Sequence, residues 1–265
     1  MPPIVSRPIM RRLFDILAIC VLLGYAWLAT RSQGGADDPV WQRAKARGVL
    51  VVGTDFGFLP FAQLEGQQPI GYDVELVEEI ARRLDLTVEW RQIGYDGLFP
   101  AIDPANPNQV DLIAAGIIQN PAEGWRARYS QAYLDGGQQL LVSSSNPITK
   151  QNQLIGSISV QLGSPGESIA RQIFSPQQID NSPYIEIAAA DLVVRGFSEA
   201  AIVGNLTALH TNNRQQTRTL ASLSYEPFVL AMPITAYELQ NQINRELGQL
   251  HAEGWIAKLN QKWFP

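Results

Sequence analysis

The run Val49-Leu50-Val51-Val52-Gly53 begins the stretch of sequence that decides the fold. Its continuous apolar character is typical of a strand buried on both faces. Residues 72–84 carry apolar side chains at helical spacing, and Asp73 is suited to cap the start of that helix. A second buried strand is predicted at Asp111-Leu112-Ile113-Ala114-Ala115, ending in Gly116. This strand–helix–strand order predicts a mostly parallel sheet with helices on its faces.

The same patterns continue along the chain and predict a second α/β series. The further elements expected are strands at 86–90, 139–143, 155–160, 184–188, 200–203 and 228–232, and helices at 98–102, 167–174, 191–196, 236–250 and 255–263. Two α/β series in one chain predict a cleft between two lobes. Ligands of such sheets bind beyond the carboxyl ends of the strands, so we expect a small-molecule site there.

Composition narrows the class of protein. The chain has 265 residues, of which 46% are hydrophobic and 17% charged, so it can form a packed core. Residues 1–36 contain four arginines and one aspartate, which leaves a net charge of −8 on the rest of the chain. An acidic body argues against nucleic acid as a partner, because nucleic-acid binding needs a basic face.

The N-terminus is predicted to be a targeting or anchoring segment, with residues 1–39 forming this segment and a polar linker. Arginines precede an apolar helix at 13–29, which favours a cytoplasmic N-terminus and an exported body. Its length fits both a cleaved signal and an uncleaved membrane anchor, and a buried core helix is the third alternative. Cys20, the only cysteine, lies in this run. The exported body therefore contains no disulfide and no thiolate metal site.

Four groups of residues occur in a specific order and spacing. They are 52–61 (Val-Gly-Thr-Asp-Phe-Gly-Phe-Leu-Pro-Phe) followed by 71–76, then 95–102 followed by 111–116, then 129–133 (Tyr-Ser-Gln-Ala-Tyr), and finally Ile243-Asn244, Gly254 and Lys262-Trp263-Phe264. Together they resemble the family 3 periplasmic solute-binding proteins, which serve polar amino-acid ABC transporters. The resemblance covers nearly all of residues 48–264.

The resemblance implies a two-lobed periplasmic-binding-protein fold of type II. Two strands would cross between the lobes near 142–146 and 223–227. The first lobe would be 40–142 plus 227–265, and the second 143–226. The implied protein is a monomeric extracytoplasmic solute-binding protein without a cofactor. It would close on an amino acid or a related small polar metabolite and deliver it to an ABC transporter permease.

The resemblance also implies a ligand site. Phe58 and Tyr95 would be its aromatic walls, with ordinary core packing as the alternative. Ala115 and Gly116 would offer backbone to a ligand ammonium, and the turn Gly163-Ser164 would offer N–H groups to a carboxylate. The full implied set is Asp55, Phe58, Tyr95, Ala115, Gly116, Ile118, Arg126, Gln161, Gly163, Ser164 and Asn205, with no catalytic residue and no metal ligand.

Three positions depart from the family pattern. Glu123 stands where the family has an arginine for the ligand carboxylate, and Arg126 could reach back or lie on the surface. Ile118 replaces a hydroxyl residue. Gly204 replaces the second-lobe aspartate that binds the ligand ammonium, and Asn205 is adjacent. Because an unpaired desolvated charge is costly, we expect an ordinary α-amino acid to bind poorly and the ligand to be changed.

Two other classes of function remain open from the sequence. The implied fold also hosts a dehydratase of cyclohexadienyl acids such as arogenate, in which Glu123 could act as a general acid. A membrane-tethered ligand sensor without transport is the other alternative. His210 and His251 are predicted to be solvated surface residues, because they lack neighbours of metal-ligand type.

Overall fold

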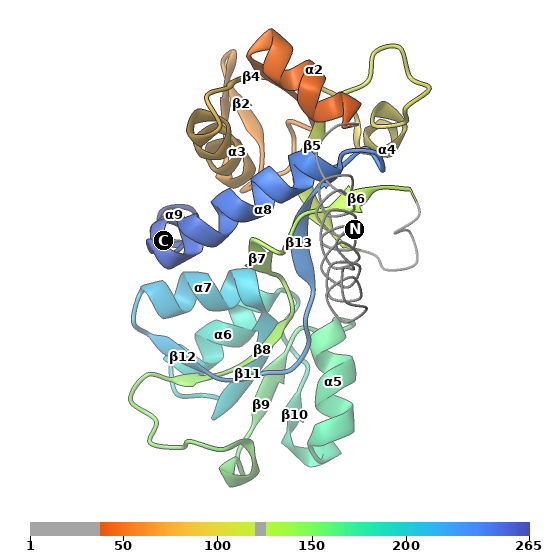
Figure 1. Ribbon diagram of the computed structural model, residues 1–265. Helices are drawn as coiled ribbons and strands as arrows, with labels where there is room; N and C mark the ends of the chain where they lie inside the picture. Colours follow the sequence, from red (N-terminus) through yellow and green to blue (C-terminus); the bar gives the residue numbers. More distant parts are fainter. Residues whose placement is uncertain (1–37, 120–125) are drawn as a thin grey trace, which may run out of the picture.

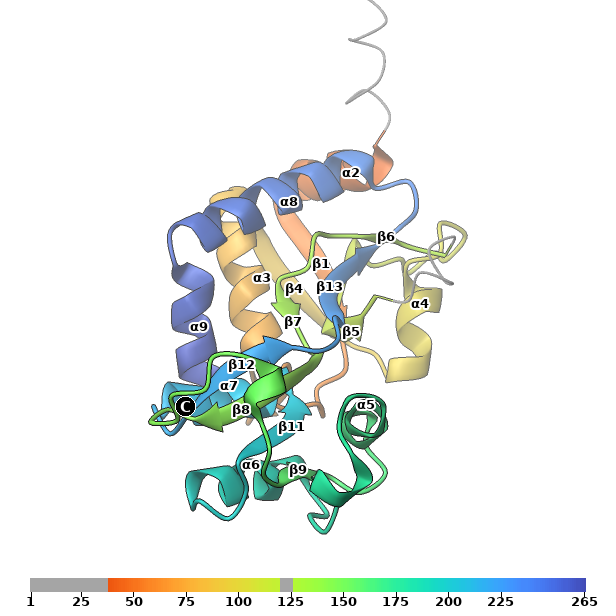
Figure 2. The same ribbon diagram turned by 90° about the horizontal axis from the view of Figure 1, so that it is seen from below.

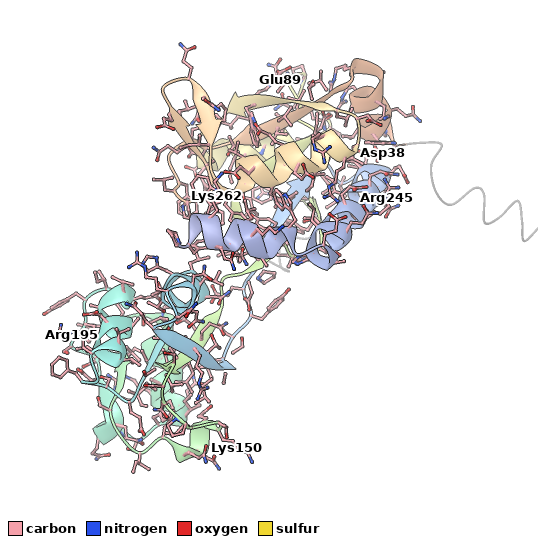
Figure 3. All side chains as sticks on the ribbon, turned by 90° about the vertical axis from the view of Figure 1, so that its left-hand side faces the viewer. Asp38, Glu89, Lys150, Arg195, Arg245 and Lys262 are labelled. Atoms are coloured by element: carbon pink, nitrogen blue, oxygen red, sulfur yellow. The ribbon has the colours of Figure 1, made fainter. Side chains whose placement is uncertain are left out.

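The computed structural model of the protein describes residues 38–119 and 126–265, which form two α/β lobes (Figure 1). Figure 3 shows the lobes from the side, with Lys262 on the upper lobe and Lys150 and Arg195 on the lower one. The predicted two-lobed α/β fold is confirmed. The predicted hydrophobic helix at 13–29 lies outside the described residues. Within the described ranges, no helix is both long and apolar enough to cross a membrane.

The first lobe is built on a six-stranded sheet. Its strands are β1 (Val49–Thr54), β4 (Thr87–Gln92), β5 (Leu112–Ile118), β6 (Arg128–Tyr129), β7 (Leu134–Asp135) and β13 (Pro227–Met232). The order is β4-β1-β5-β13-β6, and β7 pairs with β13. Strand β1 is parallel to β4 and β5, whereas β13 returns antiparallel to β5. A hairpin of β2 (Gln63–Glu65) and β3 (Gln68–Ile70) precedes the first long helix.

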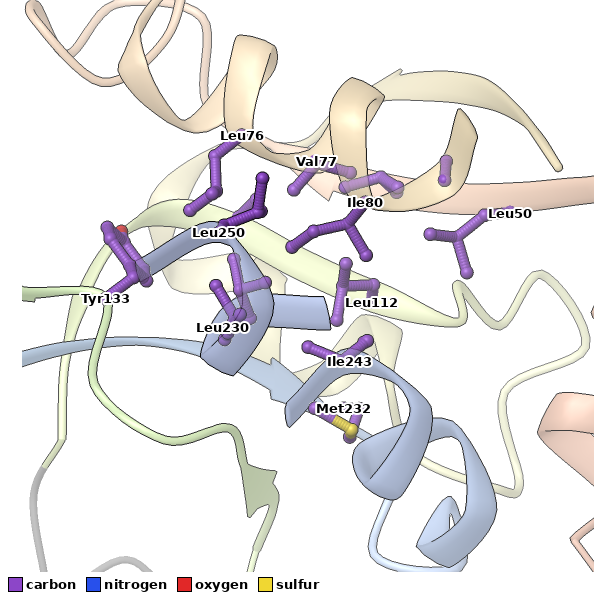
Figure 4. Close-up of a cluster of buried hydrophobic side chains, with 14 of the residues drawn as sticks. Leu50, Leu76, Val77, Ile80, Leu112, Tyr133, Leu230, Met232, Ile243 and Leu250 are labelled. Carbon is purple, nitrogen blue, oxygen red and sulfur yellow. The ribbon is translucent and has the colours of Figure 1, made fainter. Parts of the chain in front are cut away.

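Helices cover this sheet because each has one apolar face. They are α2 (Pro39–Arg47), α3 (Tyr72–Arg83), α4 (Leu98–Ala101), α8 (Tyr237–Ala252) and α9 (Trp255–Trp263), with a 3₁₀ turn at Tyr95–Gly97. Figure 4 shows Ile80 of α3 and Ile243 of α8 meeting Leu112 of β5 in the main core. Figure 2 shows α8 and α9 beside α3, so the C-terminal helices complete the lobe that the N-terminal strands begin.

Asp38 marks the start of the folded body. Its Oδ1 accepts hydrogen bonds from the backbone N–H groups of Val40 and Trp41 at the start of α2. Its Oδ2 accepts those of Glu238 and Leu239 at the start of α8. One buried carboxylate therefore caps two helices that are 200 residues apart in sequence. The predicted linker, which extended to residue 39, is two residues too long.

The second lobe is built on a five-stranded sheet of order β10-β9-β11-β8-β12. Strands β9, β10 and β11 are parallel, and β8 is antiparallel to β11 and β12. The strands are β8 (Gln138–Ser143), β9 (Ile158–Val160), β10 (Ile179–Asp180), β11 (Ala200–Gly204) and β12 (Thr217–Ser222). The helices are α5 (Pro165–Ile173), α6 (Glu186–Val194) and α7 (Asn205–Asn213), with 3₁₀ turns at Gln151–Gln153 and Pro176–Gln178.

The chain crosses between the lobes at two places. It leaves β7 and enters β8 through Gly136-Gly137, and it returns between β12 and β13 at 223–226. The return crossing is where it was predicted. The first crossing lies before β8, and all of β8 belongs to the second lobe. The predicted lobe boundary between residues 142 and 143 is therefore wrong. An apolar run such as Leu140-Leu141-Val142 suits the core of either lobe, and only its pairing with β11 assigns it to the second.

The predicted strand at 184–188 is also wrong, because α6 begins at Glu186. The helix predicted at 191–196 is the second half of this longer helix, which ends at Val194. The alternation of Tyr184, Ile185 and Ile187 suggested a strand, yet these side chains are exposed. The helix buries Ala189, Ala190 and Val193 instead. The predictions missed α7, which contains His210.

Candidate ligand-binding cleft

A cavity of about 530 Å³ lies at the carboxyl ends of β1 and β5 and reaches the start of α7 in the second lobe. It brings together six of the predicted site residues, namely those of the first lobe apart from Arg126. Its lining consists of Asp55, Gly57, Phe58, Phe61, Tyr95, Ala115, Gly116, Ile118, Leu206 and Phe228. Aromatic and aliphatic side chains dominate this lining, and it contains no lysine, arginine or histidine.

The aromatic wall is layered. Phe58 is 49% exposed and stacks on Phe61, with ring centroids 5.4 Å apart. Phe61 is buried and packs against Phe228 at 4.7 Å. Tyr95 is 55% exposed. Phe58 and Tyr95 are therefore not ordinary core residues, because each presents about half of its side chain to the cleft while buried rings support Phe58 from behind.

Asp55 is the carboxylate of this wall. It follows β1 directly and is half-buried. Its Oδ1 accepts a hydrogen bond from Gln92 Nε2 and its Oδ2 one from the backbone N–H of Tyr95, both at 3.0 Å. Asp55 thus holds the turn that carries Tyr95, and its charge remains at the edge of an otherwise apolar surface.

Gly116 forms the floor of the cavity, and its conformation requires glycine. Its φ is +59°, and a Cβ atom there would lie 2.8 Å from the Phe58 ring and 2.9 Å from the Phe61 ring. Its N–H donates to Asp73 Oδ2 at 2.7 Å. The aromatic wall can approach the sheet this closely only because position 116 has no side chain.

Asp73 lies beneath the floor rather than at a helix cap, which corrects the prediction. Gly71 takes the N-cap position of α3, so Asp73 sits inside the first turn. Its carboxylate is fully buried and also accepts the Tyr133 hydroxyl at 2.6 Å. Burial raises the pKa of Asp73 to about 6, against the two hydrogen bonds, which lower it.

Arg126 lies at the flank of the cleft. It lines an adjoining hollow of about 320 Å³ that shares Tyr95 and Ile118 with the main cavity. Its guanidinium carbon is 5.9 Å from the centre of the Phe99 ring. Ile118 is 46% exposed. Glu123, the other departure expected here, lies outside the described residues.

The predicted second-lobe residues do not line this cavity. Gln161, Gly163 and Ser164 lead into α5, where Ser164 Oγ accepts the Glu167 N–H at 3.1 Å as an N-cap. The Gly163 N–H, expected to meet a ligand carboxylate, donates to Glu167 Oε2 at 2.6 Å. This bond, followed by those from Asn181 and Arg171, lowers the pKa of Glu167 to about 2.

Asn205 is bonded to the crossing segment between the lobes. Its backbone N–H donates to the Gly137 carbonyl at 2.9 Å, and its Nδ2 donates to the Asp135 carbonyl at 2.7 Å. Asp135 Oδ1 in turn accepts the N–H groups of Gly137 and Glu226, one from each crossing. The start of α7 is therefore tied directly to the hinge.

Sequence reasoning missed Glu186. A Cβ atom on Gly204 would lie 3.1 Å from Glu186 Oε2 and 3.4 Å from Oε1, so this carboxylate occupies the space in front of Gly204. The substitution at Gly204 was expected to remove negative charge from this point, but α6 returns a carboxylate to it. A prediction that a helix begins at Glu186 would have indicated a carboxylate at this edge of the second lobe.

Among the described residues, no group of three or more His, Cys, Asp or Glu side chains is placed to hold a metal ion. His210 lies in α7 and His251 in α8, and neither lines the cavity.

Comparison with known proteins agrees with the architecture. The model of the bacterial extracellular solute-binding proteins, family 3, matches residues 50–265. The arginine-binding extracellular protein ArtP of Bacillus subtilis is 25% identical over 223 residues, which cover 81% of this chain and 86% of the relative. The L-cystine-binding protein TcyJ of Escherichia coli is 24% identical over 261 residues, covering 95% and 94%.

A solved structure also shares the fold. An ancestral cyclohexadienyl dehydratase superposes with a TM-score of 0.71 at 21% identity, covering 88% of this chain and 99% of the dehydratase. At this identity the likeness concerns the fold alone.

Proposed function

The chain belongs to the bacterial extracellular solute-binding proteins of family 3, and on that premise we propose that it is the solute-binding component of an ABC-type uptake system. Its ligand is an amino acid or a related small polar metabolite. It acts outside the cytoplasm, as a monomer, and passes its ligand to a membrane permease. The proposal is supported by relatives that bind arginine and L-cystine and cover more than four fifths of this chain.

The observation that carries the proposal is the cavity between the lobes. Its wall comes from the first lobe, yet Leu206 of the second lobe also lines it. A ligand in this cavity contacts both lobes, and only a ligand that gains contacts on closure shifts the equilibrium toward the closed form. Two short crossings that carry Gly136-Gly137 and residues 223–226 suit a hinge between two rigid bodies.

The first-lobe wall binds the ligand by excluding water and orienting it. Phe58 and Tyr95 flank the ligand, Asp55 attracts a positive group, and the backbone of Ala115 and Gly116 accepts hydrogen bonds from it. In the same proposal Ile118 sets the apolar boundary of the site, and Arg126 meets an acidic group at the flank.

The second-lobe contacts arise on closure. Gln161, Gly163 and Ser164 precede α5, and Asn205 begins α7, so all four belong to the edge of the second sheet where β9 and β11 end. The N-terminal ends of helices favour anionic groups. We place the ligand between this edge and the aromatic wall of the first lobe.

Binding rather than catalysis is the activity we propose. The dehydratase neighbour indicates a shared fold and no more. In the proposed site Asp55 is already engaged by Gln92 and Tyr95 and acts as an electrostatic partner. An assay for the loss of arogenate or prephenate tests the alternative directly, and turnover by the wild-type chain would contradict our proposal.

Calorimetric titration of the purified full-length chain with the twenty common L-amino acids and L-cystine tests the function. We expect at least one to bind in the micromolar range. The heat-capacity change of binding should be negative, because apolar surface is buried on closure. Absence of binding by all of them would contradict the proposal. Micromolar binding of a common α-amino acid would overturn the sequence-based expectation that such ligands bind poorly here; we now expect it, because Glu186 places a carboxylate in front of Gly204.

Export and membrane attachment through residues 1–39 complete the proposal. Fractionation of cells that produce the full-length chain, together with mass measurement of its N-terminus, distinguishes an anchored form from a cleaved one. Co-purification with a permease distinguishes transport from sensing.

A further inference from the structure

Glu186 is a half-buried carboxylate that has no basic partner within residues 38–119 and 126–265. It is the first residue of α6, and its Oε2 accepts a hydrogen bond from Thr207 Oγ1 at 3.1 Å. No lysine or arginine among the described residues forms an ion pair with it. By contrast, the largely buried carboxylates of Asp111, Glu79 and Glu167 each pair with arginine. A carboxylate has about four acceptor positions, so most of the capacity of Glu186 is unused within the described chain.

Glu186 stands at the edge of the second lobe that borders the cleft. Strands β9, β10 and β11 are parallel, so their carboxyl ends share one edge, and α6 and α7 both begin there. Glu186 lies in front of Gly204, the last residue of β11. Its partner Thr207 directly follows Leu206, which lines the cavity. The carboxylate of Glu186 is therefore hydrogen-bonded to the residue that follows the cavity-lining Leu206.

The opposite wall is suited to the same kind of ligand. Phe58 and Tyr95 present exposed rings, whose faces attract cations. Asp55 adds a negative charge on that wall, and the residues that line the cavity include no basic side chain. Closure would remove both carboxylates from water, which is unfavourable unless a positive group arrives with the ligand.

We infer that Glu186 is a ligand-binding residue and that the closed cleft holds a positively charged nitrogen group, ammonium or guanidinium, between Asp55 of the first lobe and Glu186 of the second. This inference rests on the proposed binding function and extends it to the charge of the ligand and the residue that selects it. Because Glu186 contacts the ligand only across the cleft, it also couples a positive charge to closure.

The test is a titration of the full-length Glu186→Gln chain with each L-amino acid that the wild-type chain binds. Loss of a charge-assisted hydrogen bond predicts a tenfold or greater rise in Kd, since such bonds are among the stronger ones. Asp191→Asn is the matched control. It removes one carboxylate from the same helix, where Asp191 pairs with Arg195 on the surface, and should change Kd less than twofold.

A rescue variant separates ligand binding from a structural role. An aspartate at position 204 would carry its carboxylate into the space that Glu186 occupies, because the Cβ atom there lies 3.1 Å from Glu186 Oε2. Gly204→Asp should therefore restore affinity when combined with Glu186→Ala, which empties that space, whereas the amide introduced by Glu186→Gln would still fill it. If Glu186 only stabilises the fold by accepting the hydrogen bond from the Thr207 hydroxyl, the Glu186→Gln chain should show a lower Tm with an unchanged Kd.

The outcomes distinguish the inference from the function beneath it. If the wild-type chain binds no amino acid of the panel, the proposed function fails and the inference fails with it. If the wild-type chain binds and Glu186→Gln binds equally well, the inference alone is overturned. A rise in Kd for both Glu186→Gln and Glu186→Ala, reversed in the Glu186→Ala chain by Gly204→Asp, supports both.

Discussion

At the scale of single residues, the cleft depends on close packing around Gly116. Its missing side chain lets Phe58 and Phe61 approach the sheet, and its N–H is held by the buried carboxylate of Asp73. The exposed face of Phe58 is thereby fixed in place before any ligand arrives. Preorganised aromatic surface lowers the entropic cost of binding.

Replacement of Phe58 tests this wall. Phe58→Ala should raise the Kd of any amino acid that binds by about tenfold, in keeping with ~1.4 kcal/mol for a lost aromatic contact. Titration calorimetry measures it. Phe197→Ala is the control, since Phe197 is 65% exposed in the second lobe and packs on Arg195 outside the cleft. Equal effects of both variants would show that Phe58 contributes only general apolar surface.

Asp73 makes stability depend on pH in a defined window. Its pKa is about 6 in the folded protein and near 3.8 in the unfolded chain. Between these values the folded state retains a proton that the unfolded state has lost, so the free energy of unfolding falls as pH rises from about 4 to 6. Two pKa units correspond to about 3 kcal/mol.

Chemical denaturation of wild type and Asp73→Asn at pH 4, 5, 6 and 7 measures this dependence. Asparagine resembles the protonated acid, so the fall in stability assigned to residue 73 should disappear in the variant. Carboxylates with lowered pKa values, such as Glu79, act below about pH 4.5 and are common to both chains. Parallel stability curves for the two chains would refute the assignment.

At the scale of elements, the N-terminal ends of helices form hydrogen bonds to segments that are distant in sequence. The carboxylate of Asp38 caps α2 and α8 together, and the start of α7 is bonded to the hinge through Asn205. The starts of α6 and α7 meet through the hydrogen bond from Thr207 to Glu186.

Removal of the shared cap should therefore be unusually destabilising. Asp38→Ala should lower the free energy of unfolding by about 2–3 kcal/mol, since a single N-cap contributes roughly 1 kcal/mol and Asp38 is also buried. Thermal and denaturant unfolding measure it. Asp191→Ala, which loses only an exposed i,i+4 ion pair, should cost about 0.5 kcal/mol or less.

The first crossing between the lobes is sterically tight. A Cβ atom on Gly137 would lie 2.2 Å from the Ser224 carbonyl oxygen in the second crossing. Gly137→Ala should therefore push the crossings apart and destabilise the protein by about 1–3 kcal/mol. Gly94→Ala has no atom within 4 Å of the new methyl group and should leave the Tm nearly unchanged. A Gly137→Ala chain as stable as wild type would mean that the crossings separate freely.

At the scale of the whole molecule, the proposed function depends on how the two lobes meet. The cavity has an aromatic first-lobe wall and only Leu206 from the second lobe, so the proposed function requires closure to bring the other second-lobe residues to the ligand. Small-angle X-ray scattering should show a smaller radius of gyration when a binding amino acid is added to the full-length chain. The Glu186→Gln chain should need a higher concentration for the same change. An unchanged radius at saturation would exclude closure.

The sequence by itself determined the elements and the class of fold. Apolar runs and helical periodicity located β1, α3, β5 and β13, and the family resemblance carried by short motifs implied that Asp55, Phe58, Tyr95 and Gly116 share one cleft. These features are local, because each depends on residues within one strand, helix or turn. For the same reason, alternating exposed residues at 184–187 were misleading, since periodicity does not report which face is buried.

Only the tertiary structure decided which distant groups meet. The pairing of β8 with β11 assigned 138–143 to the second lobe, the packing of α3 under β5 turned Asp73 toward Gly116, and the start of α6 brought Glu186 in front of Gly204. Each result depends on the angle and register between elements far apart in sequence. Side-chain patterns within one element carry no information on that geometry, so the negative charge of the second-lobe edge could not be read from position 204 alone.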